Sequence, residues 1–373
     1  MSTSPILVIS IGPAEGLVGG ITRHMHLLAE IAGHLDTPYE HFQIGRREGE
    51  SGALGQIRRL WADFRAFAAL VKARRAEGQK VVVHINTSIR PVCVAREAGF
   101  VLIGRHLKVP VIFQVHGCML EGPSDGRHWL RRLSQWVLAR SDQVVVLSHA
   151  QSVAIGGQAA MQADVVNNAV FMKPLPQPSP PPRGTMRALF MSRLVPEKGV
   201  LVCLDAVKLL RAQGLDVRLQ IAGSGPLSAV LPGKIQEMGL SEAVELLGPV
   251  PPDQVRDRML GNDVLWLPSW HPEGQPYVVL EALEAGMPVL ISRATGVVGE
   301  MIDLAADHGA PLLEVDTTGE SLANMAAMLA NDPERLGRLQ QAARALAESV
   351  YSMEAVMPKW KRVWEKSIPT EAR

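Results

Sequence analysis

The segment SWHPEGQPYVVLEALEAGMPVLIS, residues 269–292, carries two glutamates, Glu273 and Glu281, on either side of a proline. Gly274 and Pro276 predict that Glu273 lies in a loop, because proline is tolerated at the first position of a helix and not deeper. Glu281 is then expected in about the second turn of a helix that begins near Pro276. The free N–H groups and the dipole of such a helix start favour an anion. The segment therefore predicts an anion site between two carboxylates.

A ligand for this site needs hydroxyl groups on both sides of a phosphate. A nucleotide sugar has this arrangement, because its diphosphate joins a sugar to a ribose and a base. The segment MSRLVPEKG, residues 191–199, adds two cations in a turn, Arg193 and Lys198. A guanidinium fork and a mobile ammonium are suited to stabilise a departing diphosphate. Two solvated charges near a loop are the alternative interpretation.

Two glycine pairs follow expected strands. In IAGSGPL, residues 221–227, Gly223 and Gly225 allow the backbone to approach a ligand or a neighbouring helix. Ser228 stands where a dinucleotide fingerprint has its third glycine, which disfavours a dehydrogenase, and a tight turn without a ligand is an equal alternative. Gly19 and Gly20 precede the first helix and are expected to offer N–H groups to a phosphate or an acceptor, or to form only a tight turn.

Polar residues stand at the ends of two expected strands in the N-terminal half. His116 ends the strand at 109–115, and ligands in open α/β sheets bind beyond the carboxyl ends of the strands. A structural histidine is the alternative. The segment HINTS, residues 84–88, offers Asn86, Thr87 and Ser88 to the hydroxyl groups of a sugar acceptor. These residues are alternatively helix N-caps, and this interpretation is favoured for Thr87 and Ser88.

The chain of 373 residues is too long for one ordinary core, so two domains are expected. Short apolar runs alternate with helical segments, which predicts parallel sheets. Residues 1–172 are predicted to form an acceptor-binding Rossmann-like domain, and residues 173–186 a proline-rich linker. Residues 187–350 are predicted to form a nucleotide-sugar-binding Rossmann-like domain. Residues 351–373, with Trp360 and Trp364 on one helix face, are expected to pack back on the first domain.

The composition is 47% hydrophobic and 20% charged, as in soluble globular proteins. The net charge of +1 disfavours nucleic acid as a partner. Three scattered cysteines disfavour a disulfide framework or a zinc site and fit a reducing cytosol. No secretory signal and no apolar run of about 18 residues are recognisable, so a cytoplasmic location is expected.

Two segments combine basic and aromatic residues at helical spacing, residues 57–75 and 126–140. They lie in residues 1–173, which hold 19 Lys and Arg against 13 Asp and Glu. Attachment to an anionic membrane surface is one interpretation, and ordinary half-buried surface helices are the other. The sequence contains no Asp-x-Asp pair that would hold a divalent cation on a diphosphate. Arg193, Lys198 and the helix start are then expected to neutralise the diphosphate without a metal.

Taken together, the motifs SRLVPEKG, IAGSGPL, LLGPV, PEGQPYVVLEALEAGMPVL and GVVGE, in this order, resemble those of the retaining glycosyltransferases of family 4. Two glutamates separated by seven residues, as in Glu273 and Glu281, are that family's signature. The resemblance implies the GT-B fold, an α/β architecture of two Rossmann-like, doubly wound domains facing a central cleft. It also implies that no cofactor and no metal are needed.

The resemblance assigns roles position by position. The implied catalytic residues are Glu273, His116, Arg193 and Lys198, with Glu273 and His116 on the donor sugar and the two cations on the diphosphate. The implied donor-binding residues are Gly19, Gly20, Gly223, Val250, Gly274, Gln275, Pro276, Tyr277 and Glu281. Within this set, Glu281 would hold the ribose and Val250 would contact the base through its main chain. Asn86, Thr87 and Ser88 remain the candidates for the acceptor.

The implied activity is transfer of a sugar, with retention of configuration, from a UDP- or GDP-linked donor to a saccharide acceptor. A lipid-linked acceptor in bacterial surface or exopolysaccharide synthesis is expected, at the inner face of the cytoplasmic membrane. A nucleotide-sugar epimerase or a glucan synthase of the same fold is one alternative. A non-catalytic module that binds a nucleotide or a sugar is another.

Overall fold

A computed structural model describes residues 6–14, 19–45, 53–121, 126–176, 182–271 and 273–368. The chain divides into two compact units. The N-terminal unit comprises Met1–Ala169 and Met353–Arg373, and the C-terminal unit comprises Val170–Ser352. The linker expected at 173–186 lies partly outside the described residues.

The described residues of the N-terminal unit form a six-stranded sheet in the order β2-β1-β3-β4-β5-β6. Every neighbouring pair is parallel. The strands are β1 (Ile6–Gly12), β2 (Tyr39–Gln43), β3 (Lys80–Ile89), β4 (Val111–Cys118), β5 (Gln143–Val146) and β6 (Asp164–Val165). The strand order reverses at β1, which lies between β2 and β3.

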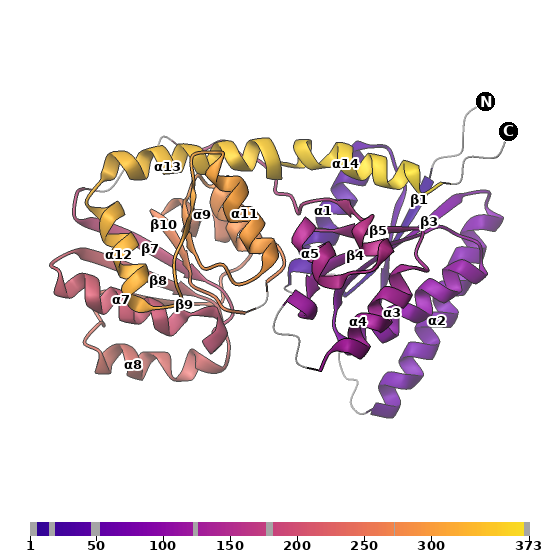
Figure 1. Cartoon of the computed structure of the whole chain (residues 1–373), viewed down its shortest axis with the longest axis horizontal. Helices are drawn as coiled ribbons and strands as arrows, with labels where there is room; N and C mark the ends of the chain where they lie inside the picture. The colour runs from indigo at the N-terminus through magenta and orange to yellow at the C-terminus, as the bar shows by residue number, and fades with distance from the viewer. Residues whose placement is uncertain are drawn as a thin grey trace. The chain divides into compact units, whose positions relative to one another are not determined.

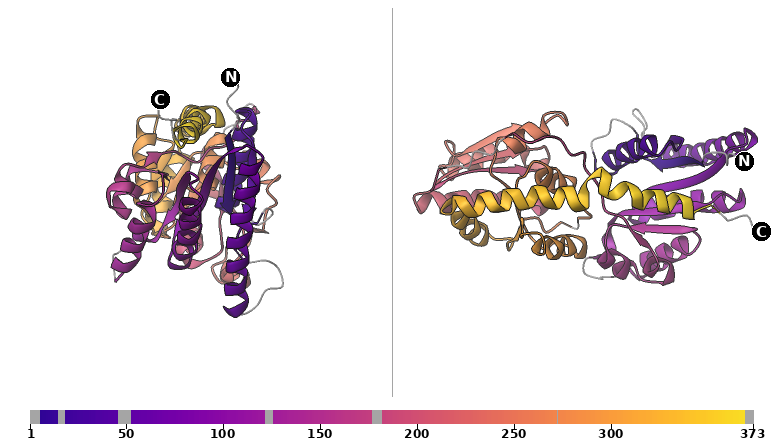
Figure 2. Two further views of the ribbon diagram at one scale, coloured as in Figure 1. Left: turned by 90° about the vertical axis from the view of Figure 1, so that its right-hand side faces the viewer. Right: turned by 90° about the horizontal axis from the view of Figure 1, so that it is seen from above.

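Helices cover both faces of this sheet, as expected for a doubly wound fold. On one face, α2, α3 and α4 lie side by side (Figure 1) and bury Phe67, Phe100 and Val137. On the other face lie α1 and α14 (Figure 2), and they bury Leu28 and Trp360. The helices are α1 (Gly20–His34), α2 (Ala53–Ala76), α3 (Pro91–His106), α4 (His128–Leu138), α5 (His149–Ile155), α6 (Gln158–Met161) and α14 (Met353–Lys366).

The last helix, α14, belongs to the N-terminal unit although it follows the whole C-terminal unit in sequence. Trp360 and Trp364 are both buried in an apolar cluster with Val8 and Val82 of the sheet. Burying two tryptophans removes several hundred square ångströms of apolar surface from water. This burial accounts for the return of the chain to its first unit.

The described residues of the C-terminal unit form a second six-stranded parallel sheet, in the order β12-β11-β10-β7-β8-β9. Counted from β7, this is the order of a dinucleotide-binding fold, with its reversal between β7 and β10. The strands are β7 (Thr185–Met191), β8 (Asp216–Ala222), β9 (Val244–Gly248), β10 (Val264–Leu267), β11 (Val289–Ile291) and β12 (Leu312–Glu314).

Seven helices of the described residues flank this second sheet, in two apolar layers. They are α7 (Val200–Ala212), α8 (Leu231–Glu237), α9 (Val255–Leu260), α10 (Tyr277–Glu284), α11 (Gly296–Ala306), α12 (Gly319–Ala330) and α13 (Pro333–Leu346). None of the helices described in either unit is long and apolar enough to cross a membrane.

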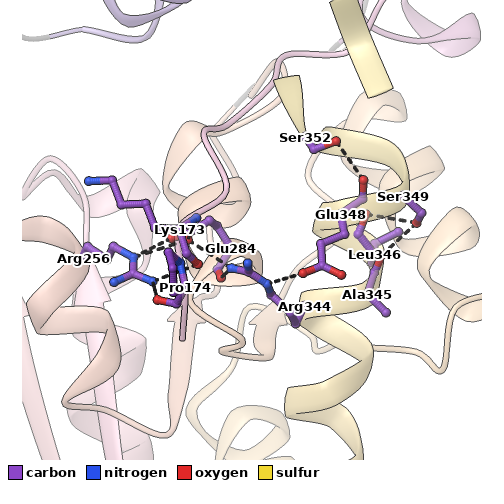
Figure 3. Close-up of polar contacts among 10 residues, drawn as sticks. All are labelled: Lys173, Pro174, Arg256, Glu284, Arg344, Ala345, Leu346, Glu348, Ser349 and Ser352. Atoms are coloured by element: carbon purple, nitrogen blue, oxygen red, sulfur yellow. Dashed lines mark hydrogen bonds and ion pairs between the residues drawn. The ribbon is translucent and has the colours of Figure 1, made fainter. Parts of the chain in front are cut away.

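A buried carboxylate anchors the start of the C-terminal unit. Glu284, at the end of α10, accepts the Lys173 N–H at 3.0 Å and forms ion pairs with Arg256 and Arg344 (Figure 3). Arg256 also donates to the Pro174 carbonyl oxygen at 2.7 Å. Three hydrogen-bonding partners compensate for the burial of this charge. The first residues of the predicted linker are therefore fixed to α9, α10 and α13.

Three strands differ from the sequence-based expectation. The edge strands β2, β6 and β12 were not predicted, and the linker predicted to end at 186 overlaps β7, which begins at Thr185. β2 has the sequence YEHFQ, which contains no apolar run because the strand is only half-buried along its length. β6 and β12 contain only two and three residues.

Candidate functional site

The reversal of strand order in the C-terminal sheet lies between β7 and β10. Ligands of open α/β sheets bind beyond the carboxyl ends of the strands at this point. The loop after β7 contains Arg193 and Lys198, and the loop after β10 contains Glu273. The fold therefore brings the two loops that carry the predicted charged residues to one edge of the sheet.

Backbone contacts hold these two loops together. Gly199 has a φ of +81°, and a Cβ atom at this position would lie 2.2 Å from the carbonyl oxygen of Pro268. The carbonyl oxygen of Glu197 accepts hydrogen bonds from Ser269 Oγ at 3.1 Å and from the Trp270 N–H at 2.9 Å. Because only glycine fits at such a close approach, Gly199 determines how near Lys198 comes to the β10 loop.

Lys198 and Glu273 form an ion pair across the two loops. Their side chains are only 7% and 17% exposed. The hydroxyl of Thr295 donates to the carbonyl oxygen of Glu273 at 2.8 Å, and it also caps α11 by accepting the Val298 N–H. The loop that carries Glu273 is thus held through both its side chain and its backbone.

The environment of Lys198 is unfavourable for its charge. The pKa of Lys198 is lowered to about 8, mainly by burial and also by the charge of Arg193, and Glu197 acts in the opposite direction. The contact with Glu273 also favours the ammonium form. Lys198 is therefore still a cation at neutral pH, in a place where water solvates it poorly, and an anionic ligand would stabilise it.

The turn after β8 packs against the turn after β7. A Cβ atom on Gly223 would lie 1.9 Å from the Ser192 carbonyl oxygen, and one on Gly225 would lie 2.5 Å from that of Leu194. Both glycines therefore allow a close backbone contact between the two turns. Arg193, between Ser192 and Leu194, has an exposed side chain. Donor binding by Gly223 stays a prediction.

The helix predicted near Pro276 is α10, which begins at Tyr277 and has Pro276 as its N-cap. Glu273 lies before this helix and Glu281 lies in its second turn, as expected. The other predicted donor-binding residues of the segment differ in exposure. Gln275 and Tyr277 are buried, whereas Gly274, Pro276 and Glu281 are half-buried. Val250, which follows β9, packs half-buried against an apolar cluster that includes residues of α10.

The remaining predicted site residues belong to the N-terminal unit. His116 lies in β4 and Asn86 lies in the neighbouring strand β3. His116 Nε2 is hydrogen-bonded to Asn86 Oδ1 at 3.1 Å, and both side chains are buried. Gly19 and Gly20 form the exposed start of α1.

The N-cap interpretation of Thr87 and Ser88 is wrong. Both residues lie within β3, which extends to Ile89, and the N-cap of α3 is Arg90. Thr87 is buried and Ser88 is half-buried. The strand continues beyond its apolar run because Thr87 and Ser88 still pair with β4, opposite Val115 and Gly117, and a single sequence does not reveal this pairing.

Two further histidines lie beside His116 and were not singled out from the sequence. Gln114 Oε1 is 2.9 Å from His24 Nε2 and 3.0 Å from His84 Nε2. Burial lowers the pKa of His24 to about 4, and burial together with the charge of His24 lowers that of His84 to about 3. The signal in the sequence was the alternation of His84 with Asn86 and of Gln114 with His116 along two buried strands.

In the described ranges of the chain, no group of three or more His, Cys, Asp or Glu side chains is placed to hold a metal ion. Metal independence stays a prediction from the sequence.

A model of glycosyltransferase family 4 matches residues 18–152, and a model of glycosyl transferases group 1 matches residues 173–346. HepE of Anabaena, solved in complex with UDP-glucose, superimposes with a TM-score of 0.69 at 18% identity, over 96% of this chain and 99% of its own. TarM superimposes with a TM-score of 0.74 at 12% identity, over 97% and 99% of the two chains.

Two parallel six-stranded sheets with flanking helices are the architecture of the GT-B glycosyltransferases. The chain belongs to the family 4 type of these enzymes.

Curated relatives match shorter parts of the chain. The putative colanic acid biosynthesis glycosyltransferase WcaL of Escherichia coli is 27% identical over 48% of this chain and 45% of its own. The amylovoran biosynthesis glycosyltransferase AmsK of Erwinia amylovora is 32% identical over 30% of this chain and 29% of its own. The match thus spans less than half the length of these relatives.

Proposed function

We propose that this chain is a retaining glycosyltransferase that moves a sugar from a nucleotide-sugar donor to a saccharide acceptor. The observation that carries the proposal is the buried contact of Lys198 with Glu273 at the reversal of strand order in the C-terminal sheet. It combines a cation for a diphosphate with a carboxylate for sugar hydroxyls. The charge of Arg193 lowers the pKa of Lys198, so Arg193 is a second cation in the same region.

In the proposed reaction, the acceptor oxygen bonds to the anomeric carbon on the face from which the diphosphate departs. The bond between this carbon and the diphosphate oxygen breaks, and the acceptor proton passes to the departing phosphate. Lys198 and Arg193 stabilise the charge that develops on the diphosphate. Pairing with Lys198 makes the Glu273 carboxylate a weak nucleophile, which favours binding of sugar hydroxyls by Glu273 over double displacement.

The proposed donor is linked to UDP or GDP. The structural neighbour HepE was solved with UDP-glucose, which supports testing UDP-sugars first. Glu281, in the second turn of α10, is the proposed ligand of the ribose. In the proposal, the two cations and the start of α10 neutralise the diphosphate, so that no metal is required.

The proposed acceptor is a lipid-linked saccharide in the synthesis of a bacterial surface polysaccharide or exopolysaccharide. The names of the relatives WcaL and AmsK, which refer to colanic acid and amylovoran, support this setting. A lipid-linked acceptor requires the enzyme to work at a membrane surface. The proposed membrane-binding surface is the exposed face of the N-terminal unit formed by α2, α3 and α4.

That face combines exposed tryptophans with arginines. On α4, Trp129, Arg132 and Trp136 follow one another at spacings of three and four residues, and all three are exposed. The Arg140 guanidinium lies 3.9 Å from the centre of the Trp136 ring. Trp61 is exposed on α2, and α2, α3 and α4 cover the same face of the sheet. Aromatic rings flanked by cations suit the interface of an anionic membrane.

A panel of UDP-, GDP- and ADP-sugars tests the activity. We expect transfer to a saccharide acceptor from one donor, with the anomeric configuration retained in the product by NMR and with activity unaffected by EDTA. An epimerase would convert the donor sugar without any acceptor, and a glucan synthase would extend a soluble glucan. Nucleotide binding without turnover of any donor would identify a non-catalytic module.

Co-sedimentation with vesicles tests the membrane proposal. We expect binding to phosphatidylcholine vesicles only when they contain phosphatidylglycerol, and reduced binding after Trp129→Glu with Trp136→Glu. Leu209→Glu, which changes an exposed apolar side chain of the C-terminal unit, is the matched control. Equal binding to neutral and anionic vesicles, or no binding to either, would contradict the proposal.

A further inference from the structure

A polar row crosses the face of the N-terminal sheet that α1 and α14 cover. Ser10 of β1 pairs with His84 of β3, and Asn86 of β3 pairs with Gln114 of β4. On the same face and nearer the amino ends of the strands, Val8, Val82 and Ile112 enter the apolar cluster of this face. This face of the sheet is therefore apolar near the amino ends of its strands and polar near their carboxyl ends, where His116 lies.

A bulge sets the position of His116. Thr87 pairs with Val115 and Ser88 pairs with Gly117, so the register shifts and His116 is the extra residue of β4. A bulge of this kind bends the strand and re-aims a side chain, and it leaves the residue without a partner in the ladder. The direction of the imidazole therefore has to be fixed by a side chain.

Asn86 supplies that contact, and its own orientation is fixed. Asn86 Nδ2 donates to Ser10 Oγ at 2.9 Å and lies 3.5 Å from the carbonyl oxygen of Ile11, which can only accept. Asn86 Oδ1 therefore faces His116 Nε2, at 3.1 Å. An amide oxygen only accepts, so His116 Nε2 carries the proton, and in a neutral imidazole Nδ1 is then an acceptor.

We propose that Asn86 is a positioning residue that holds His116 neutral and oriented, with Nδ1 available to accept a hydrogen bond from a sugar hydroxyl. This inference rests on the proposed function, in which His116 contacts the donor sugar. It also reassigns Asn86, which the sequence suggested as a ligand of the acceptor. Both ends of the Asn86 amide are used inside the protein, and the side chain is 2% exposed.

The surroundings of His116 favour the neutral ring. His24 of α1 packs edge-to-face on His116 with ring centres 4.5 Å apart, and His84 of β3 is the other titratable neighbour. Burial lowers the pKa of His116 well below its usual value, and the charges of His24 and His84 lower it further. From α14, the ring of Trp360 packs against His24 and His84. A neutral ring suits an uncharged sugar hydroxyl.

The first test measures the contact without any activity. In protein labelled with nitrogen-15 at histidine, the His116 signals are assigned by their loss in His116→Gln. We expect wild-type His116 to stay neutral throughout the pH range in which the protein is folded. Asn86→Asp should raise the pKa of His116 into the measurable range, because a carboxylate then faces its Nε2–H. An unchanged titration in Asn86→Asp would overturn the proposal even if no donor had been found.

The second test is a kinetic cycle. Asn86→Ala is expected to lower kcat by about 10-fold, the scale of losing one orienting hydrogen bond, with the acceptor KM unchanged. The same change in a His116→Ala background should have no further effect, because Asn86 acts through His116. Additive losses, or a raised acceptor KM in Asn86→Ala, would show that Asn86 contacts the acceptor directly.

Controls separate positioning from folding. Ser134→Ala removes a different buried polar group of the N-terminal unit, a hydroxyl that donates to the Leu130 carbonyl oxygen far from His116 in sequence. We expect it to keep kcat at the wild-type value. In Asn86→Asp, kcat should fall at low pH as His116 becomes charged, whereas a loss of folding would lower activity at every pH and appear in the thermal unfolding curve.

Discussion

The two sheets share one architecture, but the side chains at the carboxyl ends of their strands differ. Those of the C-terminal sheet are charged, and those of the N-terminal sheet are uncharged. Both sheets have six parallel strands among the described residues. The C-terminal edge places a cation, Lys198, against a carboxylate, Glu273. The N-terminal edge joins a neutral imidazole, His116, to an amide, Asn86. In the proposed function, the fold determines where the ligand binds, and the side chains suit one edge to a diphosphate and the other to an uncharged sugar.

The comparison predicts its largest effect at Lys198. Lys198→Ala should lower kcat by about 10²-fold or more, because the developing charge on the diphosphate loses a buried donor. Lys208→Ala, at an exposed position of α7, is the matched control and should keep wild-type kcat. Steady-state kinetics with the best donor measure both variants. Equal kcat in all three proteins would show that Lys198 does not contact the diphosphate.

The close contact of the two loops in the C-terminal unit gives a second prediction. Gly199 and Gly214 have φ angles of +81° and +79°, but only Gly199 has another residue within reach of an added Cβ. Gly214→Ala should cost about 1 kcal/mol for the left-handed backbone alone. Gly199→Ala should cost about 3 kcal/mol, because the Cβ also meets the Pro268 carbonyl group.

Urea unfolding of the two alanine variants measures this difference. A similar free energy of unfolding for both would mean that the loop of Pro268 moves aside without cost. Kinetics add a second criterion, since Gly199→Ala should also lower kcat by displacing Lys198, whereas Gly214→Ala should not.

The two edges also differ in how far the sequence predicts them. Short apolar runs such as PILVISI indicate the central strands and the two Rossmann-like units, because strands buried on both faces are apolar throughout. The residue types of the C-terminal site were also predictable. The pairing of Lys198 with Glu273 was not, because they are 75 positions apart and meet only through the approach of Gly199 to Pro268.

At the N-terminal edge the sequence indicated His116 and Asn86 but not their contact. That contact depends on the register of β3 against β4 and on the bulge at His116. Register is determined by the packing of whole faces, and a shift of one residue exchanges the two faces of a strand. The burial of His24 beside this row requires in addition the docking of α1, which local patterning does not specify.

The neutral edge predicts an acid-sensitive N-terminal unit. His24 and His84 have pKa values of about 4 and about 3 in the folded state, below the ordinary 6.5. On acidification below about 6.5, the unfolded chain binds protons first, so the stability present above that pH is lost as the pH falls toward 4. At pH 5 each histidine should lower the free energy of unfolding by about 1–2 kcal/mol.

Hydrogen exchange of amides in β3 and β4 at pH 7 and pH 5 measures this loss within the N-terminal unit. His84→Gln should reduce the difference between the two pH values, and His106→Gln, at an exposed position of α3, should not. If His84→Gln left the pH dependence unchanged, protonation of His84 would not be the cause.

The charged edge of the C-terminal sheet predicts a smaller effect of pH, in which activity is lost as the pH rises rather than as it falls. Activity that needs the Lys198 ammonium should fall as the pH rises through about 8, where Lys198 loses its proton. Glu273→Gln removes the carboxylate that favours the ammonium, so this basic limb should move to lower pH by about one unit. The pH profile of kcat/KM for the two proteins measures the shift. A basic limb that stayed in place would mean that Glu273 does not control the charge of Lys198 in the free enzyme.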